Sequence, residues 1–203
     1  EGLGIPGLAA LLLYSRGITD LDDAHKLLYP KLEHLSDPLL LPDIQKGVER
    51  TIEAIQKHEK ICLFGDYDAD GVTSVALLVN FFKHIGIMPE VYIPERHEGY
   101  GLNIHAIKKF KEQGISLLIC LDCGSSNIEE VEEARKYGID VVIIDHHELS
   151  SSHPSAIALI NPKIADSRFP TRELAACGVA FFFILALRRI MSRYGLLKHH
   201  INM

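Results

Sequence analysis

Short apolar runs alternate with longer amphipathic segments along most of this chain. Apolar runs cover residues 61–64, 117–121 and 141–144, and helical patterns flank each of them. Short β-rich runs in such a setting are typical of strands buried in a parallel sheet. The segment 43–59 shows the other pattern, because Ile44, Val48, Ile52 and Ile55 recur on one helical stripe. The alternation therefore predicts repeated β-α-β units.

These units predict an α/β fold, in which a parallel β-sheet carries helices on both faces and the crossovers are right-handed. The expected strands cover residues 61–64, 90–93, 117–121, 140–144 and 156–160. The expected helices cover residues 43–59, 72–85, 103–113, 127–137 and 174–194.

A short helical segment is expected ahead of this alternation. One helix covers residues 5–15, and Thr19 or Asp20 caps a second helix that ends before Pro30. An irregular connector follows at 31–42. We therefore expect two parts, an N-terminal helical preface at 1–59 and an α/β domain at 60–203.

Composition narrows the class of protein. No stretch approaches the ~18 apolar residues of a membrane span, so we expect no membrane association. Four cysteines are too few for a disulfide scaffold and fit reduced thiols, so we expect a cytoplasmic location. Cys120 and Cys123 have the spacing of a redox or zinc pair, but Asp122 interrupts them and no second such pair exists. Since the first residue is Glu1, we expect the chain to begin inside a longer protein.

The net charge of −6 argues against a freestanding electrostatic nucleic-acid binder. It does not exclude an enzyme that acts on nucleic acid, because bound divalent cations would offset much of the negative charge.

Acidic residues follow three of the expected strands. Asp66, Asp68 and Asp70 come after the first, Asp122 after the third, and Asp145 with His146 and His147 after the fourth. In open α/β sheets ligands bind beyond the carboxyl ends of the strands, and clustered carboxylates repel unless a cation neutralises them. Oxygen ligands with one or two imidazoles suit Mg²⁺ or Mn²⁺. The pattern predicts a metal site there.

Each of these residues has a simpler alternative. An aspartate is common at the start of a helix, so the first cluster could be a cap with solvated acids. Asp122 could cap the helix expected at 127–137, and His147 could be an ordinary surface-loop residue. Three aspartates at a spacing of two, directly after a buried strand, favour the metal interpretation for the first cluster.

The ordered motifs resemble those of a known family. Gly-Asp-Tyr-Asp-Ala-Asp-Gly at 65–71, Leu-Asp-Cys-Gly at 121–124 and Asp-His-His at 145–147 are similar to the first three motifs of the DHH phosphoesterase superfamily. The surrounding sequence resembles the RecJ-type single-strand-specific exonucleases within it. That likeness includes residues 92–101, Ile160-Asn161-Pro162-Lys163 and 174–181, and it runs through essentially the whole chain.

The resemblance implies a role for each motif residue. Asp68 and Asp70 match metal ligands, and Asp66 is a third carboxylate that either ligates or supports a ligand. Asp122 matches an aspartate that bridges two metal ions, and His146 matches a metal-binding histidine. His147 matches the histidine beside the scissile phosphate, and Asp145 would orient a histidine.

The implied activity is metal-dependent phosphodiester hydrolysis, with two Mn²⁺ or Mg²⁺ ions, on single-stranded DNA from the 5′ end, in DNA repair and recombination. A helicase or a single-strand-binding protein is an expected partner. Arg96 is our candidate for the 5′ phosphate, the alternative being an ion pair with Glu95 or Glu98. Tyr100 would stack on a base or pack within its turn.

Two departures from the family pattern affect these expectations. Phe64 stands where some members have an additional histidine ligand, and a fourth motif with a further aspartate does not occur before Met203. We therefore expect a fragment that ends before the fourth motif and is weak or inactive alone. Two other functions remain open. One is a small-substrate enzyme, such as an oligonucleotide phosphodiesterase or a pyrophosphatase, and the other is a catalytically inactive DHH scaffold module in replication.

Overall fold

The computed structural model describes residues 3–197 of the chain. These residues fall into two compact units, Glu1–Asp37 and Pro38–Met203, which are described separately. None of the helices within the described residues is long and apolar enough to cross a membrane.

The first unit contains the two predicted short helices, α1 (Gly7–Ser15) and α2 (Leu21–Leu28), followed by a 3₁₀ turn η1 (Leu32–His34). Of the two candidate caps, Asp20 is the one used. Its Oδ1 accepts hydrogen bonds from the backbone N–H groups of Asp22 at 2.8 Å and Asp23 at 3.1 Å, which is the usual stabilisation of a helix start. Ala24 is the one buried residue among residues 3–37, so this unit has almost no core of its own.

The second unit is built on a five-stranded sheet in which all neighbouring strands are parallel. Its strand order is β2-β1-β3-β4-β5. The strands are β1 (Ile61–Gly65), β2 (Glu90–Tyr92), β3 (Leu117–Leu121), β4 (Asp140–Ile144) and β5 (Ala158–Ile160). The last residues of β1, β3 and β4 are in register, because Gly65 pairs with Leu121 and Leu121 with Ile144. The residues that directly follow these three strands therefore lie next to one another at the carboxyl edge of the sheet.

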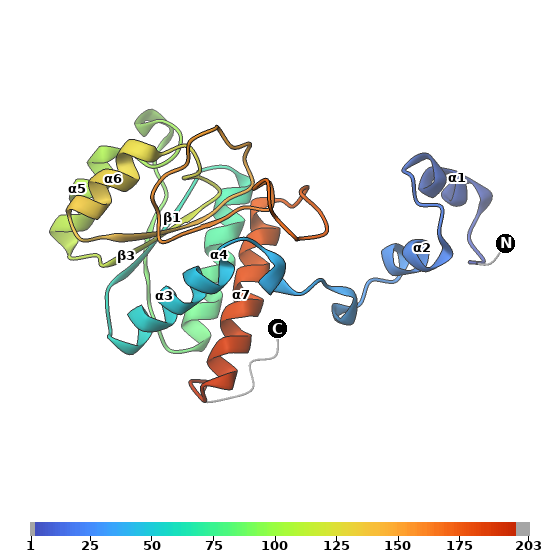
Figure 1. Cartoon of the computed structure of the whole chain (residues 1–203), viewed down its shortest axis with the longest axis horizontal. Helices are drawn as coiled ribbons and strands as arrows, with labels where there is room; N and C mark the ends of the chain where they lie inside the picture. Colours follow the sequence, from blue (N-terminus) through green and yellow to red (C-terminus); the bar gives the residue numbers. More distant parts are fainter. Residues whose placement is uncertain (1–2, 198–203) are drawn as a thin grey trace. The chain divides into compact units, whose positions relative to one another are not determined.

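Helices cover both faces of the sheet, as predicted (Figure 1). One face packs against α3 (Ile44–Gln56), α4 (Ala69–His84) and α7 (Ala176–Arg193), and the other packs against α5 (Ile104–Gln113) and α6 (Ile128–Lys136). Strand β1 shows the alternation, since Leu63 lies in the first core and Phe64 in the second. The predicted parallel α/β fold is confirmed.

The compact units divide between Asp37 and Pro38, which is earlier than the domain boundary predicted at residue 59. The reason is the apolar stripe of α3, where Ile44, Val48 and Ile52 are buried in the same core as α7 and β5. Burial of an aliphatic side chain contributes roughly 1.5–3 kcal/mol. The stripe therefore fixes α3 to the sheet.

Candidate metal centre

The sheet places three aspartates side by side just beyond its carboxyl edge. The backbone N–H of Asp66 donates to the carbonyl of Leu121, that of Asp122 to Ile144, and that of Asp145 to Ile160. The ladder of hydrogen bonds thus continues one residue past β1, β3 and β4. The first residue after each strand is bonded to the neighbouring strand, and each is an aspartate.

The first motif turns sharply from β1 into α4. A Cβ atom at Gly71 would lie 2.3 Å from the backbone oxygen of Asp66, so only glycine permits this close approach. Asp68 is the N-cap of α4, and its Oδ1 accepts from the Gly71 N–H at 3.0 Å. That hydrogen bond lowers the pKa of Asp68. Helix α4 begins at Ala69, ahead of the predicted start at 72, because Asp68 caps it.

Asp122 is a buried carboxylate for which the structure supplies no hydrogen bond. It is 1% exposed, and both of its oxygens are without a partner. Burial, and after it the neighbouring carboxylate of Asp68, raises the pKa of Asp122 to about 8. Its backbone has a φ of 63°, a left-handed conformation that aspartate tolerates better than most residues. Asn127, not Asp122, stands at the N-cap of α6, so the capping alternative for Asp122 is wrong.

Asp66, like Asp122, is a buried carboxylate without a hydrogen-bond partner. It is 1% exposed, and neither carboxylate oxygen has a hydrogen-bond partner. Burial raises the pKa of this carboxyl. One ligand atom each from Asp66, Asp68 and Asp122 lie within 4.8 Å of one another. Orphaned buried carboxylates of this kind are costly unless a proton or a cation satisfies them.

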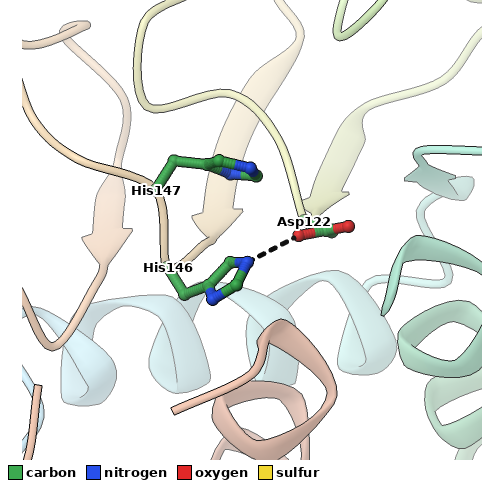
Figure 2. A group of neighbouring side chains, drawn as sticks. All are labelled: Asp122, His146 and His147. Carbon is green, nitrogen blue, oxygen red and sulfur yellow. Dashed lines mark ion pairs between the residues drawn. The ribbon is translucent and has the colours of Figure 1, made fainter. Parts of the chain in front are cut away.

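His146 turns one ring nitrogen toward these acids. Its Nδ1 lies 2.9 Å from the Leu174 carbonyl oxygen, which can only accept, so Nδ1 carries the proton of that hydrogen bond. In the neutral ring Nε2 then presents a lone pair. It lies 3.3 Å from Oδ1 of Asp122 and 3.9 Å from Oδ2 of Asp70, as Figure 2 shows for Asp122. A lone pair facing two carboxylates requires a proton or a cation between them.

Asp145 differs from Asp66 and Asp122 because both of its carboxylate oxygens accept hydrogen bonds from the protein. Its Oδ2 accepts from the Ser125 N–H at 3.1 Å, and its Oδ1 accepts from the N–H groups of His146 at 2.7 Å and His147 at 3.3 Å. Oδ1 also receives the ring Nδ1–H of His147 at 2.7 Å. Burial alone would raise the pKa of Asp145, but the hydrogen bonds from Ser125 and His147 outweigh it and hold the pKa below its ordinary value.

His147 is therefore a fixed side chain in an exposed position. With Nδ1–H directed to Asp145, Nε2 is the ring nitrogen left for a further contact. Asp122, His146 and His147 contribute ligand atoms that lie within 4.8 Å of one another. Figure 2 shows both histidine rings on one loop and turned toward Asp122. The structure thus brings His147 to the acidic cluster instead of leaving it on a distant surface.

Two residues close to His147 were not singled out from the sequence as its supports. The hydroxyl of Tyr100 lies 3.0 Å from Nε2 of His147, and the amide Nδ2 of Asn161 donates to the His147 carbonyl at 3.0 Å. Asn161 directly follows β5 and is fully buried. Its position after a strand, like that of the aspartates, was a signal that could have identified it.

Arg96 lies beside the first motif rather than in an ion pair with its neighbours. Its guanidinium carbon is 5.6 Å from the ring centroid of Tyr67, the residue between Asp66 and Asp68. Within the described residues Glu98 instead accepts from the Tyr92 hydroxyl at 2.6 Å and from the Glu95 N–H at 2.7 Å. Arg96 is exposed on the 3₁₀ turn η3 (Arg96–Glu98) and makes no ion pair there.

The donor set fits hard divalent cations. It consists of carboxylate oxygens and one imidazole lone pair, which are ligands of Mg²⁺ and Mn²⁺. Cys62, Cys120 and Cys123 are buried free thiols. Neither group of candidate metal ligands within residues 3–197 contains a cysteine, so the cysteine pair does not form part of this centre.

Comparison with known proteins agrees with the geometry. The DHH family, N-terminal domain, matches residues 60–201. The single-stranded-DNA-specific exonuclease RecJ of Bacillus subtilis is 38% identical over 188 residues, which are 92% of this chain and 24% of that protein. The exonuclease of the same name from Escherichia coli is 35% identical over 193 residues, 94% of this chain and 33% of that protein. The chain thus spans about a quarter to a third of the length of these curated relatives.

Solved structures give the same result. The crystal structure of RecJ in complex with Mn²⁺ from Thermus thermophilus is 27% identical, with a TM-score of 0.70, over 92% of this chain and 25% of that chain. A crystal structure of exonuclease RecJ bound to manganese is 29% identical, with a TM-score of 0.68, over 76% of this chain and 39% of that chain. Because the family match covers most of the chain and includes all three motifs, this protein belongs to the DHH family.

Proposed function

We propose that this chain carries the metal-binding part of a RecJ-like exonuclease, which hydrolyses single-stranded DNA from the 5′ end in DNA repair and recombination. The observation that carries the proposal is the state of Asp122. This carboxylate is 1% exposed, has no hydrogen-bond partner, and faces the lone pair of His146. Such an arrangement needs a proton or a cation between the two groups, and the carboxylates gathered around it favour a divalent cation.

The ligands in this proposal are Asp66, Asp68, Asp70, Asp122 and His146. Asp122 is common to the two groups of candidate ligands, so it is the residue suited to lie between two ions. Divalent cations bound there would supply charge neutralisation and an acidified water for attack on phosphorus. The tautomer of His146, set by the Leu174 carbonyl, presents the nitrogen that a metal requires.

The remaining residues act on the substrate. Asp145 orients His147, whose ring lies beside the acidic cluster, where a phosphate oxygen of the scissile bond would lie. Arg96 is exposed, lies beside the first motif, and is free of ion pairs within residues 3–197. A guanidinium in that state suits a terminal phosphate.

The substrate in this proposal comes from the relatives, which are named as single-stranded-DNA-specific exonucleases. We extend to this chain the substrate that their names give, together with 5′-to-3′ polarity, a cytoplasmic location, and a helicase or single-strand-binding protein as partner. The residues of this chain themselves support the binding of divalent cations by carboxylate and imidazole ligands.

The test is hydrolysis of a single-stranded oligonucleotide by a protein that carries this chain at the full length of its curated relatives, because we expect the chain alone to be weak or inactive. The oligonucleotide is labelled at the 5′ end in one reaction and at the 3′ end in another. With Mn²⁺ or Mg²⁺ we expect early release of the 5′-labelled nucleotide, gradual shortening of the 3′-labelled strand, and no reaction in EDTA. Asp122→Asn should abolish the reaction, whereas Asp166→Asn, at an exposed aspartate outside the cluster, should leave it unchanged.

Three outcomes would contradict the proposal. Hydrolysis that persists in EDTA would remove the metal from the mechanism. Cleavage of dinucleotides without cleavage of long strands would indicate a small-substrate enzyme. Binding of Mn²⁺ and of DNA without any hydrolysis would indicate an inactive scaffold.

A further inference from the structure

Tyr100 connects the loop after β2 to two of the motifs described above. Its hydroxyl oxygen lies 3.0 Å from Nε2 of His147 and 3.2 Å from the backbone oxygen of Asp122. Its ring packs edge-on against the His147 ring, with centroids 5.8 Å apart and an angle of 81° between the planes. One side chain therefore touches both the second and the third motif.

The loop that carries Tyr100 is fastened on its far side. Leu102 is 2% exposed, and its carbonyl accepts from the side-chain amide of Asn127 at 3.0 Å. The flanking Gly99 and Gly101 have φ values of 91° and 76°, which are conformations that favour glycine. A Cβ at Gly101 would lie 3.1 Å from Oδ1 of Asn127. The tyrosine is thus held in place by its neighbours and not only by its own contacts.

The hydrogen bonds of His147 give the tyrosine its role. Since Nδ1–H is directed to Asp145, Nε2 is the ring atom that meets the Tyr100 hydroxyl, whose single hydrogen points either to Nε2 or to the Asp122 carbonyl oxygen. Asp145 alone fixes one end of the ring, and the contact at Nε2 fixes the other. Two fixed ends define the orientation of an imidazole, whereas one leaves it free to tilt.

We propose that Tyr100 is a positioning residue for the hydrolysis proposed above. Its hydroxyl, 3.0 Å from Nε2 of His147 and 3.2 Å from the Asp122 carbonyl oxygen, fixes the tilt of the imidazole ring beside the acidic cluster. The hydroxyl acts through His147. A purely structural role is a poor explanation, because Tyr100 is 54% exposed and belongs to neither hydrophobic core.

The experiment compares two hydroxyl deletions. Tyr100→Phe removes the hydroxyl at His147. Tyr92→Phe removes a hydroxyl at the end of β2, which donates to Glu98 at 2.6 Å and lies outside the motifs. We expect Tyr100→Phe to lower kcat roughly ten- to hundredfold, since small misplacements of a reacting group have such effects. KM should change by no more than about twofold. Tyr92→Phe should retain nearly full kcat.

A double-mutant comparison shows whether the hydroxyl acts through His147. In a His147→Ala background, Tyr100→Phe should cause no further loss of kcat, because its target is already gone. Tyr100→Leu in the wild-type background removes the ring as well, and a rise in KM confined to that variant would reveal a separate stacking contact with a base. A full additional loss of kcat from Tyr100→Phe in the His147→Ala background would overturn the proposal.

A measurement without activity separates this inference from the proposed function on which it rests. The ring nitrogen resonances of His147 in the metal-free protein should shift in Tyr100→Phe and remain unchanged in Tyr92→Phe. If the wild-type protein cleaves no DNA but this shift occurs, the proposed function is wrong and the positioning contact stands. If the His147 resonances are the same in all three proteins, the positioning role is wrong whatever the activity.

Discussion

Asp122 and Asp145 occupy equivalent places in the sheet and have opposite electrostatic environments. Each directly follows a strand, each donates its backbone N–H to the next strand, and each is 1% exposed. The carboxylate of Asp145 accepts hydrogen bonds from Ser125, His146 and His147. The carboxylate of Asp122 accepts none. The pKa values follow this difference, since that of Asp145 lies below its ordinary value and that of Asp122 is raised to about 8.

The difference separates two uses of a buried acid. A buried carboxylate that the protein itself satisfies is a structural support, and here it holds the loop that carries both histidines. A buried carboxylate that the protein leaves unsatisfied lowers stability and persists where a ligand compensates for it. The same residue type at the same strand position can therefore serve either purpose, and the surrounding hydrogen bonds decide which.

The first expected difference concerns metal affinity. Asp122→Asn removes a charged oxygen ligand while retaining a residue that tolerates a φ of 63°. We expect Mn²⁺ affinity to fall by about a hundredfold or more, which corresponds to roughly 2.8 kcal/mol. Asp145→Asn should cost about tenfold, as expected for a residue that orients ligands without touching the metal. Free Mn²⁺ measured by electron paramagnetic resonance gives both values, and equal losses would refute the distinction.

The same pair of substitutions should have opposite effects on the metal-free protein. Asp145→Asn weakens hydrogen bonds to a buried charge, so we expect the free energy of unfolding to fall by about 2–4 kcal/mol. Asp122→Asn relieves repulsion among the acids and should raise it by about 1 kcal/mol. Urea unfolding in EDTA measures both changes. If Asp122→Asn is the more destabilising of the two, then Asp122 has a structural partner and the comparison fails.

The fold was largely predictable from the sequence. Strands β3 and β4 match the predicted residues at both ends, because a continuous apolar run between helical segments leaves few alternatives. Helix boundaries were less certain, as α4 shows, since a cap residue such as Asp68 also has the features of a metal ligand. The division at Asp37 was not predictable from local pattern, because it depends on where the apolar stripe of α3 is buried.

The site was predictable in position but not in detail. Aspartates after adjacent strands must meet at one edge, and pattern alone indicates this. Pattern does not distinguish Asp122 from Asp145, because the donors to Asp145 come from Ser125 and from the conformation of its own loop. The contact between Tyr100 and His147 joins residues far apart in the chain through an irregular loop, so its geometry had no local signal.

The dependence of stability on pH offers a third comparison. A carboxyl whose pKa is about 8 when folded and about 4 when unfolded binds more protons in the folded state between these values. Stability of the metal-free protein should therefore fall as pH rises from about 4 to about 8, by on the order of 1–3 kcal/mol. Asp122→Asn should flatten this slope. Asp145, with a lowered pKa, contributes stability above pH 4 that is lost only in stronger acid.

The free energy of unfolding, measured by urea in EDTA at several pH values between 5 and 8, tests this prediction. The slope of wild-type protein should exceed that of Asp122→Asn throughout. A stability that rises with pH across this interval, in both proteins alike, would show that Asp122 is not the group that titrates there.

The smallest expected effect concerns Asn161, a buried polar residue that is satisfied like Asp145. Its amide donates to the His147 carbonyl at 3.0 Å and its oxygen accepts from the Lys163 N–H at 2.9 Å. Asn161→Ala should lower the free energy of unfolding by about 1–2 kcal/mol. It should change Mn²⁺ affinity by less than about threefold, because none of the five ligands in the proposal loses a hydrogen bond with Asn161. Lys163→Gln, which removes an exposed pair with Glu148, should cost at most about 0.5 kcal/mol. If Asn161→Ala left stability intact and weakened Mn²⁺ binding as strongly as Asp122→Asn, hydrogen-bond satisfaction would no longer separate support from ligand in this protein.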